Sequence, residues 1–152
     1  MYPAISDKER QEEVVELCQH LIQKQSYSGH EDGVAGVLEE QLKKKGFDSV
    51  TVDKYGNVIG CIKGNRPGKK ILFDGHIDTV PVTDETEWQY PPFAAEIHDG
   101  KIYGRGTSDM KGAVAGFVTA AAAFAEDTKK DFAGEIYVAG VVHEECFEGV
   151  AA

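Results

Sequence analysis

Two short apolar segments constrain the fold of this chain more than any other feature of its sequence. Lys70–Asp74 and Glu135–Val142 are largely apolar and have the length of strands, and such runs are typical of strands buried within an α/β sheet. Between them, Gly112–Glu126 consists mainly of small residues and contains four consecutive alanines. Because small side chains allow close packing, we predict that this segment is a helix lying against the sheet.

Two amphipathic helices are predicted before the first of these strands. Apolar residues recur at helical spacing over residues 7–25, and Ser6–Glu9 has the spacing of a capping box at the start of this segment. A second periodic segment follows Ser28–Glu31, which has the same capping-box spacing, and Gly46 provides its stop signal. We therefore expect two capped helices in the first third of the chain.

The remaining segments complete an α/β pattern. Residues 49–53 and 58–63 have the composition of two strands joined by a tight turn, which predicts a β-hairpin. Residues 64–68 are expected to form a surface turn, 81–100 a long loop, and 101–103 a short strand. The order helix, helix, hairpin, strand, loop, helix, strand indicates an α/β fold, and the length fits one domain.

The charge of the chain excludes several classes of partner. The 152 residues carry a formal net charge of −10, all of which arises in residues 74–152. Nucleic-acid binding needs a basic surface that displaces counterions, and anionic membranes repel an acidic protein. No apolar run approaches the length of about 20 residues that a membrane span needs. We therefore expect neither a nucleic acid nor a membrane as partner.

The cysteines and the first residues of the chain bear on its compartment. Three widely spaced cysteines form neither a disulfide framework nor a CxxC metal motif. The first residues lack the basic and apolar regions of a signal peptide. We therefore expect a reducing compartment, the cytoplasm.

A histidine and an aspartate follow the first apolar strand. His76 and Asp78 are two residues apart, so in extended backbone their side chains point to the same side. His76 can bind a metal through one ring nitrogen while the carboxylate of Asp78 accepts the N–H of the other. A His–Asp pair in a loop without a metal is the alternative.

Two further acidic clusters flank the predicted helix and the second apolar strand. Asp109 lies in a glycine-rich segment just before the helix, where it is either an N-cap or a metal ligand. Glu144 and Glu145 follow the strand, either as a polar strand exit or as carboxylates beside a cation. His143 before them is either a polar strand end or a group that supports the site without binding the metal. Because α/β sheets place their sites at the carboxyl ends of strands, the clusters together favour a zinc, cobalt or manganese site.

Several motifs, matched in order and spacing, carry a family resemblance. They are Gly75–Pro81, Trp88, Pro92–Phe93, Asp99–Gly112 and Glu144–Glu145. With these motifs the sequence resembles the zinc-dependent deacylases and exopeptidases that include acetylornithine deacetylase, succinyl-diaminopimelate desuccinylase, carboxypeptidase G, aminoacylase and related dipeptidases. The resemblance implies a zinc-exopeptidase-like catalytic domain with a central mixed sheet flanked by helices.

The resemblance also implies a role for each residue of the clusters. His76 would be a ligand of one zinc ion, Asp109 the bridging ligand, and Glu145 a ligand of the other ion. Glu144 would be the general base, and Asp78 the partner that orients His76. The cofactors implied are two Zn²⁺ ions, with Co²⁺ or Mn²⁺ as substitutes.

The activity that the resemblance implies is amide hydrolysis by a metal-activated water. The substrates would be small N-acyl amino acids, or peptides from which a terminal residue is removed. In this family the peptide bond after the bridging aspartate is cis, so Asp109–Met110 is expected to be cis.

The family pattern extends further than this sequence. In the family, another carboxylate ligand and a distal histidine ligand follow the Glu-Glu motif, and a lid and dimerisation domain lies between them. The resemblance thus implies that residues 1–152 are the N-terminal part of the catalytic domain, inactive alone, and that any homodimer forms through the absent domain. A non-catalytic metal-binding α/β module and an α/β domain without metal are the alternatives.

Overall fold

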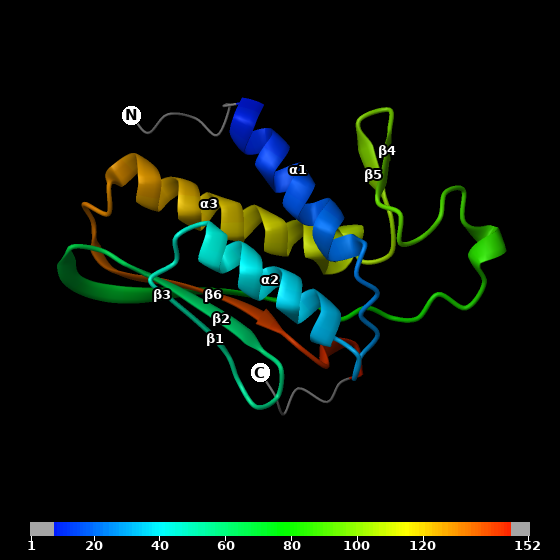
Figure 1. Ribbon diagram of the computed structural model, residues 1–152, viewed down its shortest axis with the longest axis horizontal. Coiled ribbons are helices and arrows are strands. Elements are labelled where there is room, and N and C mark those ends of the chain that lie inside the picture. The colour runs from blue at the N-terminus through cyan, green and yellow to red at the C-terminus, as the bar shows by residue number, and fades with distance from the viewer. Residues whose placement is uncertain (1–7, 147–152) are drawn as a thin grey trace.

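A computed structural model (Figure 1) describes residues 8–146 of the chain. It contains three α-helices, six strands and three short helical turns within these residues. The helices are α1 (Lys8–Ile22), α2 (Asp32–Lys44) and α3 (Gly112–Thr128). The strands are β1 (Ser49–Val52), β2 (Val58–Lys63), β3 (Arg66–His76), β4 (Glu96–His98), β5 (Lys101–Tyr103) and β6 (Ala133–Val141). The short turns are η1 (Glu85–Glu87), η2 (Thr107–Lys111) and η3 (Glu144–Cys146).

The central sheet is mixed, as the family resemblance implies. Its strand order is β1-β2-β6-β3, in which β1 with β2 and β2 with β6 are antiparallel while β3 with β6 is parallel. β4 and β5 form a separate two-stranded sheet. This small sheet and the long loop before it project beyond one end of the central sheet (Figure 1). The predicted hairpin is confirmed, with Val52 of β1 opposite Val58 of β2.

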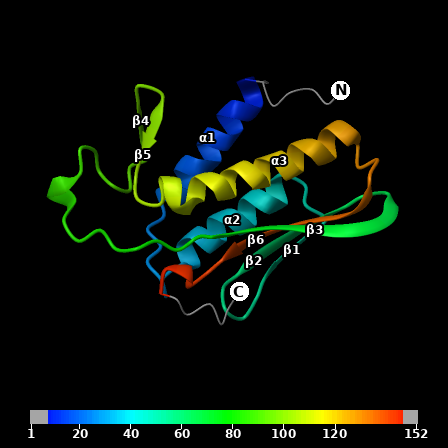
Figure 2. The ribbon, with the colours of Figure 1, turned by 180° about the vertical axis from the view of Figure 1, so that it is seen from behind.

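All three helices lie on one face of the central sheet (Figures 1 and 2). α2 contacts β1 and β2, α3 contacts β3 and β6, and α1 packs on α2 and α3. The core between these layers is built from buried aliphatic side chains, among them Leu17, Leu21, Ile22, Leu38, Val58, Ile62, Ile77, Val114, Val118 and Val138. None of the helices in residues 8–146 combines the length and hydropathy that crossing a bilayer requires.

Two glycines on the helix-facing side of the sheet allow this close approach. Gly75 of β3 and Gly140 of β6 are paired in the parallel register. A Cβ atom at Gly75 would lie 2.8 Å from Met110 Cε, and one at Gly140 would lie 2.4 Å from Leu38 Cδ2. The glycines therefore leave room for α2 and for the turn before α3 at the end of the sheet where β3 and β6 finish.

The expectation that the strand at residues 70–74 is buried is wrong. β3 is longer than predicted, since it begins at Arg66 within the predicted turn, and its residues up to Asp74 are exposed. β3 lies at the edge of the sheet, where within the described chain it pairs only with β6. Ile71, Leu72 and Phe73 are therefore exposed although their composition is that of a buried strand. The second predicted strand, β6, lies between two neighbours and is buried towards its end.

The predicted capping boxes have different outcomes. Ser6–Glu9 begins outside the described residues, within which α1 begins at Lys8. Ser28–Glu31 is not a capping box, because no side-chain hydrogen bond caps α2. The side chains of Ser28 and Glu31 instead contact residues far along the chain, as described below. The helix stop is confirmed, with Gly46 just beyond α2 at a φ of 77°.

A pair of leucine-to-alanine substitutions tests this arrangement. Leu38→Ala removes a side chain that is 1% exposed between α2 and the sheet, and we expect the free energy of unfolding to fall by about 2–5 kcal/mol. Leu72→Ala removes a side chain that is 57% exposed on β3, and we expect a loss of less than about 1 kcal/mol. Urea unfolding of the two variants measures both values, and equal losses would contradict the edge position of β3.

Candidate metal centre

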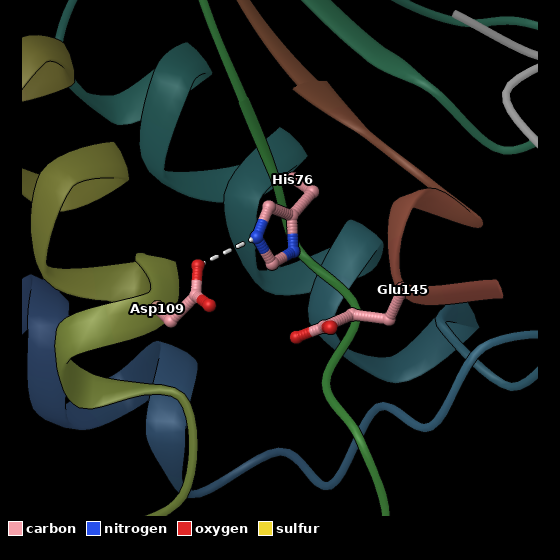
Figure 3. Close-up of side chains that lie close together, drawn as sticks. All are labelled: His76, Asp109 and Glu145. Atoms are coloured by element: carbon pink, nitrogen blue, oxygen red, sulfur yellow. Dashed lines mark hydrogen bonds and ion pairs between the residues drawn. The ribbon is translucent and has the colours of Figure 1, made fainter. Parts of the chain in front are cut away.

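The parallel pairing of β3 with β6 determines where the candidate site forms. In this register His76, the last residue of β3, lies beside Val141, the last residue of β6. The segment that carries Glu144 and Glu145 therefore begins next to His76. The turn η2, which leads into α3, brings Asp109 to the same place from a third direction (Figure 3).

Three side chains converge closely enough to share a metal ion. One ligand atom each of His76, Asp109 and Glu145 lies within 4.8 Å of the others. Figure 3 shows Asp109 and Glu145 reaching toward His76 from separate segments of the chain. His76 is 4% exposed, whereas the Asp109 side chain faces solvent. The structure thus brings together all three residues that the sequence predicts as ligands, at a place open to solvent on one side.

The two ring nitrogens of His76 have different surroundings. Nδ1 lies 3.0 Å from the backbone carbonyl oxygen of Asp78 and 3.4 Å from its carboxylate. Since both oxygens only accept, Nδ1 carries a proton. Nε2 lies 3.0 Å from Asp109 Oδ1 and 3.8 Å from Glu144 Oε2, which also only accept. The oxygens around Nε2 can therefore accept a second proton on this nitrogen or bind a metal cation beside it.

The charge around His76 favours a cation in this place. Hydrogen bonding to Asp78, opposed by burial and aided by Asp109, raises the pKa of His76 to about 9. Burial, together with the carboxylates of Asp109, Asp78 and Glu144, raises the pKa of Glu145 above its usual value. Imidazole and carboxylate groups are ligands that zinc accepts, and a divalent ion would offset the repulsion among these acids. The donor set therefore fits a metal ion.

Asp78 is a fully buried carboxylate with several donors. Ser28 Oγ donates to its Oδ2 at 2.6 Å, and the backbone N–H groups of Glu144 and Glu145 donate to its two oxygens. Burial alone would raise the pKa of Asp78, but the hydrogen bonds from His76, Ser28, Glu145 and Glu144 lower it to about 2. Asp78 therefore stays ionised and joins the segment after β3 to the segment after β6. The sequence predicts its contact with His76, but not its contacts with Ser28 or this backbone.

Asp109 does not cap α3, which corrects one of its two interpretations. The residue before α3 is Lys111, and no side-chain hydrogen bond caps that helix. Gly106, at a φ of 81°, begins the turn that carries Asp109, so a residue without a side chain is required there. The Asp109–Met110 peptide bond is cis, as the resemblance implies.

A buried lysine that the sequence does not single out anchors this turn. Lys111 is fully buried, and its Nζ donates to the backbone carbonyls of Leu21 at 2.9 Å and Lys24 at 2.8 Å. These carbonyls lie at the C-terminal end of α1, where a cation is stabilised by the helix dipole. Burial lowers the pKa of Lys111 to about 8. Lys111 thus ties the turn bearing Asp109 to the end of α1.

His143 lies beyond the end of β6 and outside the ligand cluster. It has a positive φ of 63°, so the backbone turns there before Glu144. Its side chain lies near Gly29, where a Cβ atom would be 3.8 Å from the Cε1 of His143. The side chain of His143 thus lies beside Gly29 and is not part of the group of three ligands found in residues 8–146.

The chain matches a known protein family over much of its length. The family described as Peptidase family M20/M25/M40 matches residues 72–152, which is more than half of the chain. The chain belongs to this family. The match begins within β3 and includes every residue of the candidate metal centre.

Individual relatives are similar to this chain in sequence and in fold. A succinyl-diaminopimelate desuccinylase from Roseobacter denitrificans is 36% identical over 91% of this chain and 37% of its own length. The M20 family metallo-carboxypeptidase Sso-CP2 from Sulfolobus solfataricus superposes with a TM-score of 0.78 at 27% identity, over 88% of this chain and 31% of its own. Human carnosine dipeptidase 1 has the same fold, with a TM-score of 0.79 at 23% identity, over 98% of this chain and 36% of its own. The chain therefore spans about a third of the length of these relatives.

The anchoring role of Lys111 can be tested by stability. Lys111→Met keeps most of the side-chain volume but removes the Nζ donor from the carbonyls of Leu21 and Lys24. The Leu21 carbonyl still accepts from the Lys24 N–H at 3.3 Å, whereas the Lys24 carbonyl loses the Nζ donor. We expect the free energy of unfolding to fall by about 1–3 kcal/mol. Lys44→Met, at an exposed position on α2, is the matched control and should change it by less than about 0.5 kcal/mol. Urea unfolding measures the free energy of unfolding of both variants. Similar losses in the two would refute the anchoring role of Lys111.

Proposed function

We propose that this chain provides the metal centre of a metal-dependent amide hydrolase. The observation that carries the proposal is the convergence of His76, Asp109 and Glu145, with Glu144 beside them, at the ends of β3 and β6. Membership of the M20 family supports the same conclusion, since its peptidases depend on metal ions. The substrates proposed are small N-acyl amino acids or short peptides, in keeping with the desuccinylase and dipeptidase relatives.

The proposed cofactor is a pair of divalent ions, Zn²⁺ or in its place Co²⁺ or Mn²⁺. His76 would hold one ion through Nε2, Glu145 would hold the other, and Asp109 would bridge the two. When bound, such ions act as Lewis acids that polarise the amide carbonyl and lower the pKa of water. Asp78 keeps a proton of His76 on Nδ1, so that Nε2 is the nitrogen whose lone pair would bind the ion.

Glu144 is the proposed general base. Its side chain is 59% exposed, and its Oε2 lies 3.8 Å from His76 Nε2. The carboxylate can therefore reach the position that a metal ion bound to Nε2 would occupy. It can also reach a substrate that enters from solvent. In the proposed reaction Glu144 takes a proton from the attacking water and passes it to the nitrogen of the leaving amine.

The wider setting of the chain is also a proposal. We infer that residues 1–152 form the N-terminal part of a larger catalytic domain, which the relatives' greater length and the exposed apolar residues of β3 support. A homodimer would then form through a further domain. A cytoplasmic location agrees with the three cysteines, all of which are free thiols.

Zinc titration tests the metal centre. We expect zinc to bind the wild-type protein and to stabilise it against unfolding, by about 2.7 kcal/mol when free zinc is 100 times its Kd. His76→Ala should abolish this stabilisation because it removes a ligand. His98→Ala is the matched control, since His98 also pairs with a carboxylate, Glu96 at 2.7 Å, but is not part of a group of three ligands in residues 8–146. Calorimetry and thermal unfolding with and without zinc measure both effects.

The result of this titration separates the classes of function. A wild-type protein that binds no zinc would overturn the metal centre and favour an α/β domain without metal. Zinc binding without hydrolysis of N-acyl amino acids or dipeptides, in the protein at its full natural length, would favour a non-catalytic metal-binding module.

A second substitution tests the general base. Glu144→Gln removes the proton acceptor but keeps the shape of the side chain, so zinc affinity should stay within a few-fold of wild type. Turnover of an N-acyl amino acid or dipeptide should fall by about 10²–10⁴-fold. Glu40→Gln, at an exposed position on α2, should leave turnover unchanged. Near-normal turnover by Glu144→Gln in the full-length protein would refute the assignment.

A further inference from the structure

The segment that carries Glu144 and Glu145 is held by side chains rather than by a strand partner. Beyond the end of β6, the backbone N–H of Val142 donates to Asn57 Oδ1 at 3.0 Å. The next N–H, that of His143, donates to Glu31 Oε1 at 3.2 Å. Neither acceptor is near in sequence, because they lie 85 and 112 residues away.

The next two N–H groups continue the same pattern. The N–H of Glu144 donates to Asp78 Oδ1 at 3.3 Å, and the N–H of Glu145 donates to Asp78 Oδ2 at 3.1 Å. Four consecutive backbone N–H groups, from 142 to 145, thus each meet an oxygen of a buried side chain. A segment fixed in this way does not depend on regular secondary structure for its position.

The three acceptors come from different parts of the fold. Asn57 lies in the turn between β1 and β2, Glu31 immediately precedes α2, and Asp78 follows β3. Two of them are held in turn by other side chains. Asp53 Oδ2 accepts from Asn57 Nδ2 at 2.9 Å, and Ser28 Oγ donates to Asp78 at 2.6 Å. The three acceptors therefore fix the segment relative to β1, β2, α2 and β3.

The contact of Glu31 is the most informative of the four. Its carboxylate is buried at the start of α2, where the N-terminal end of the helix favours a negative charge. Its Oε1 receives the N–H of His143, the residue at which the backbone turns with positive φ before Glu144. Without this acceptor, the backbone donor at the turn would lose its partner, and only the three neighbouring hydrogen bonds would hold the direction in which Glu144 and Glu145 leave the turn.

We propose that Glu31 and Asn57 are positioning residues of the metal centre, which act through the backbone of residues 142–145 to place Glu144 and Glu145 opposite His76. The inference rests on the proposed function, because it takes this cluster to be a metal centre. Groups that orient metal ligands typically change metal affinity or activity by about 10–100-fold when they are removed. The hydrogen bonds from this segment to Asn57 and Glu31 come from its backbone N–H groups.

Two substitutions at one position separate positioning from simple stability. Glu31→Gln keeps an oxygen that can accept the N–H of His143, whereas Glu31→Met has similar length and no such oxygen. We expect Glu31→Met to weaken zinc binding at least about 10-fold, and Glu31→Gln to stay within about 2-fold of wild type. Competition with a chelating indicator measures the affinity, and the visible absorption of the Co²⁺-loaded protein reports the ligand geometry, which should change only in Glu31→Met.

A stability control and a second position complete the test. Val118→Ala, on the buried face of α3, should lower the thermal stability but leave the zinc affinity and the Co²⁺ spectrum unchanged. Asn57→Leu, which removes the acceptor of the Val142 N–H, should act in the same direction as Glu31→Met.

The outcomes distinguish this inference from the proposed function. If Glu31→Met loses only thermal stability, as Val118→Ala does, the inference is overturned. It is also overturned if Glu31→Gln binds zinc as weakly as Glu31→Met, since the charge and not the acceptor would then matter. A wild type that binds zinc without hydrolysing amides refutes the proposed function alone, and one that binds no zinc refutes both.

Discussion

The parallel pairing of β3 with β6 is the constraint on which the rest of the structure depends. Parallel strands that are neighbours in a sheet finish at the same edge, so His76 and the segment after Val141 are brought together whatever lies between them in sequence. The connection between the two strands must cross over the sheet, and α3 is the helix that does so. Asp109 lies at the start of this crossover helix and therefore returns to the same edge.

The acids gathered at this edge require compensation, which hydrogen bonds supply in part. Asp78 is buried and ionised because four donors surround it, and these donors join three segments of the chain. Within residues 8–146, Asp109, Glu144 and Glu145 have no comparable set of donors, and they face a shared space beside His76. Together with Asp78, these residues are four of the 15 acids in residues 74–152, and they gather where a cation would be held.

The sequence predicts most of the elements because periodicity is a local signal. Strand ends point to the clusters, and the family resemblance implies the role of all five residues in them. The sequence predicts wrongly where a residue's partner is distant. Ser28 and Glu31 have the spacing of a capping box, but their partners Asp78 and His143 lie 50 and 112 residues away. Lys111 has no local signal at all, because its carbonyl partners at the end of α1 meet it only through tertiary packing. Leu72 is apolar in an apolar run, but it lies on an edge strand and on the sheet face that carries no helix, and both positions expose it.

By itself the sequence determines the elements of this protein and the kinds of side chain that follow its strands, because helix and strand periods and the chemistry of His, Asp and Glu are properties of neighbouring residues. Only the tertiary structure decides the strand order, which side chains meet, and which backbone donors the buried oxygens of Asn57, Glu31 and Asp78 accept. The physical reason is that a buried polar group must find a partner wherever packing places it, and packing joins residues without regard to their distance along the chain.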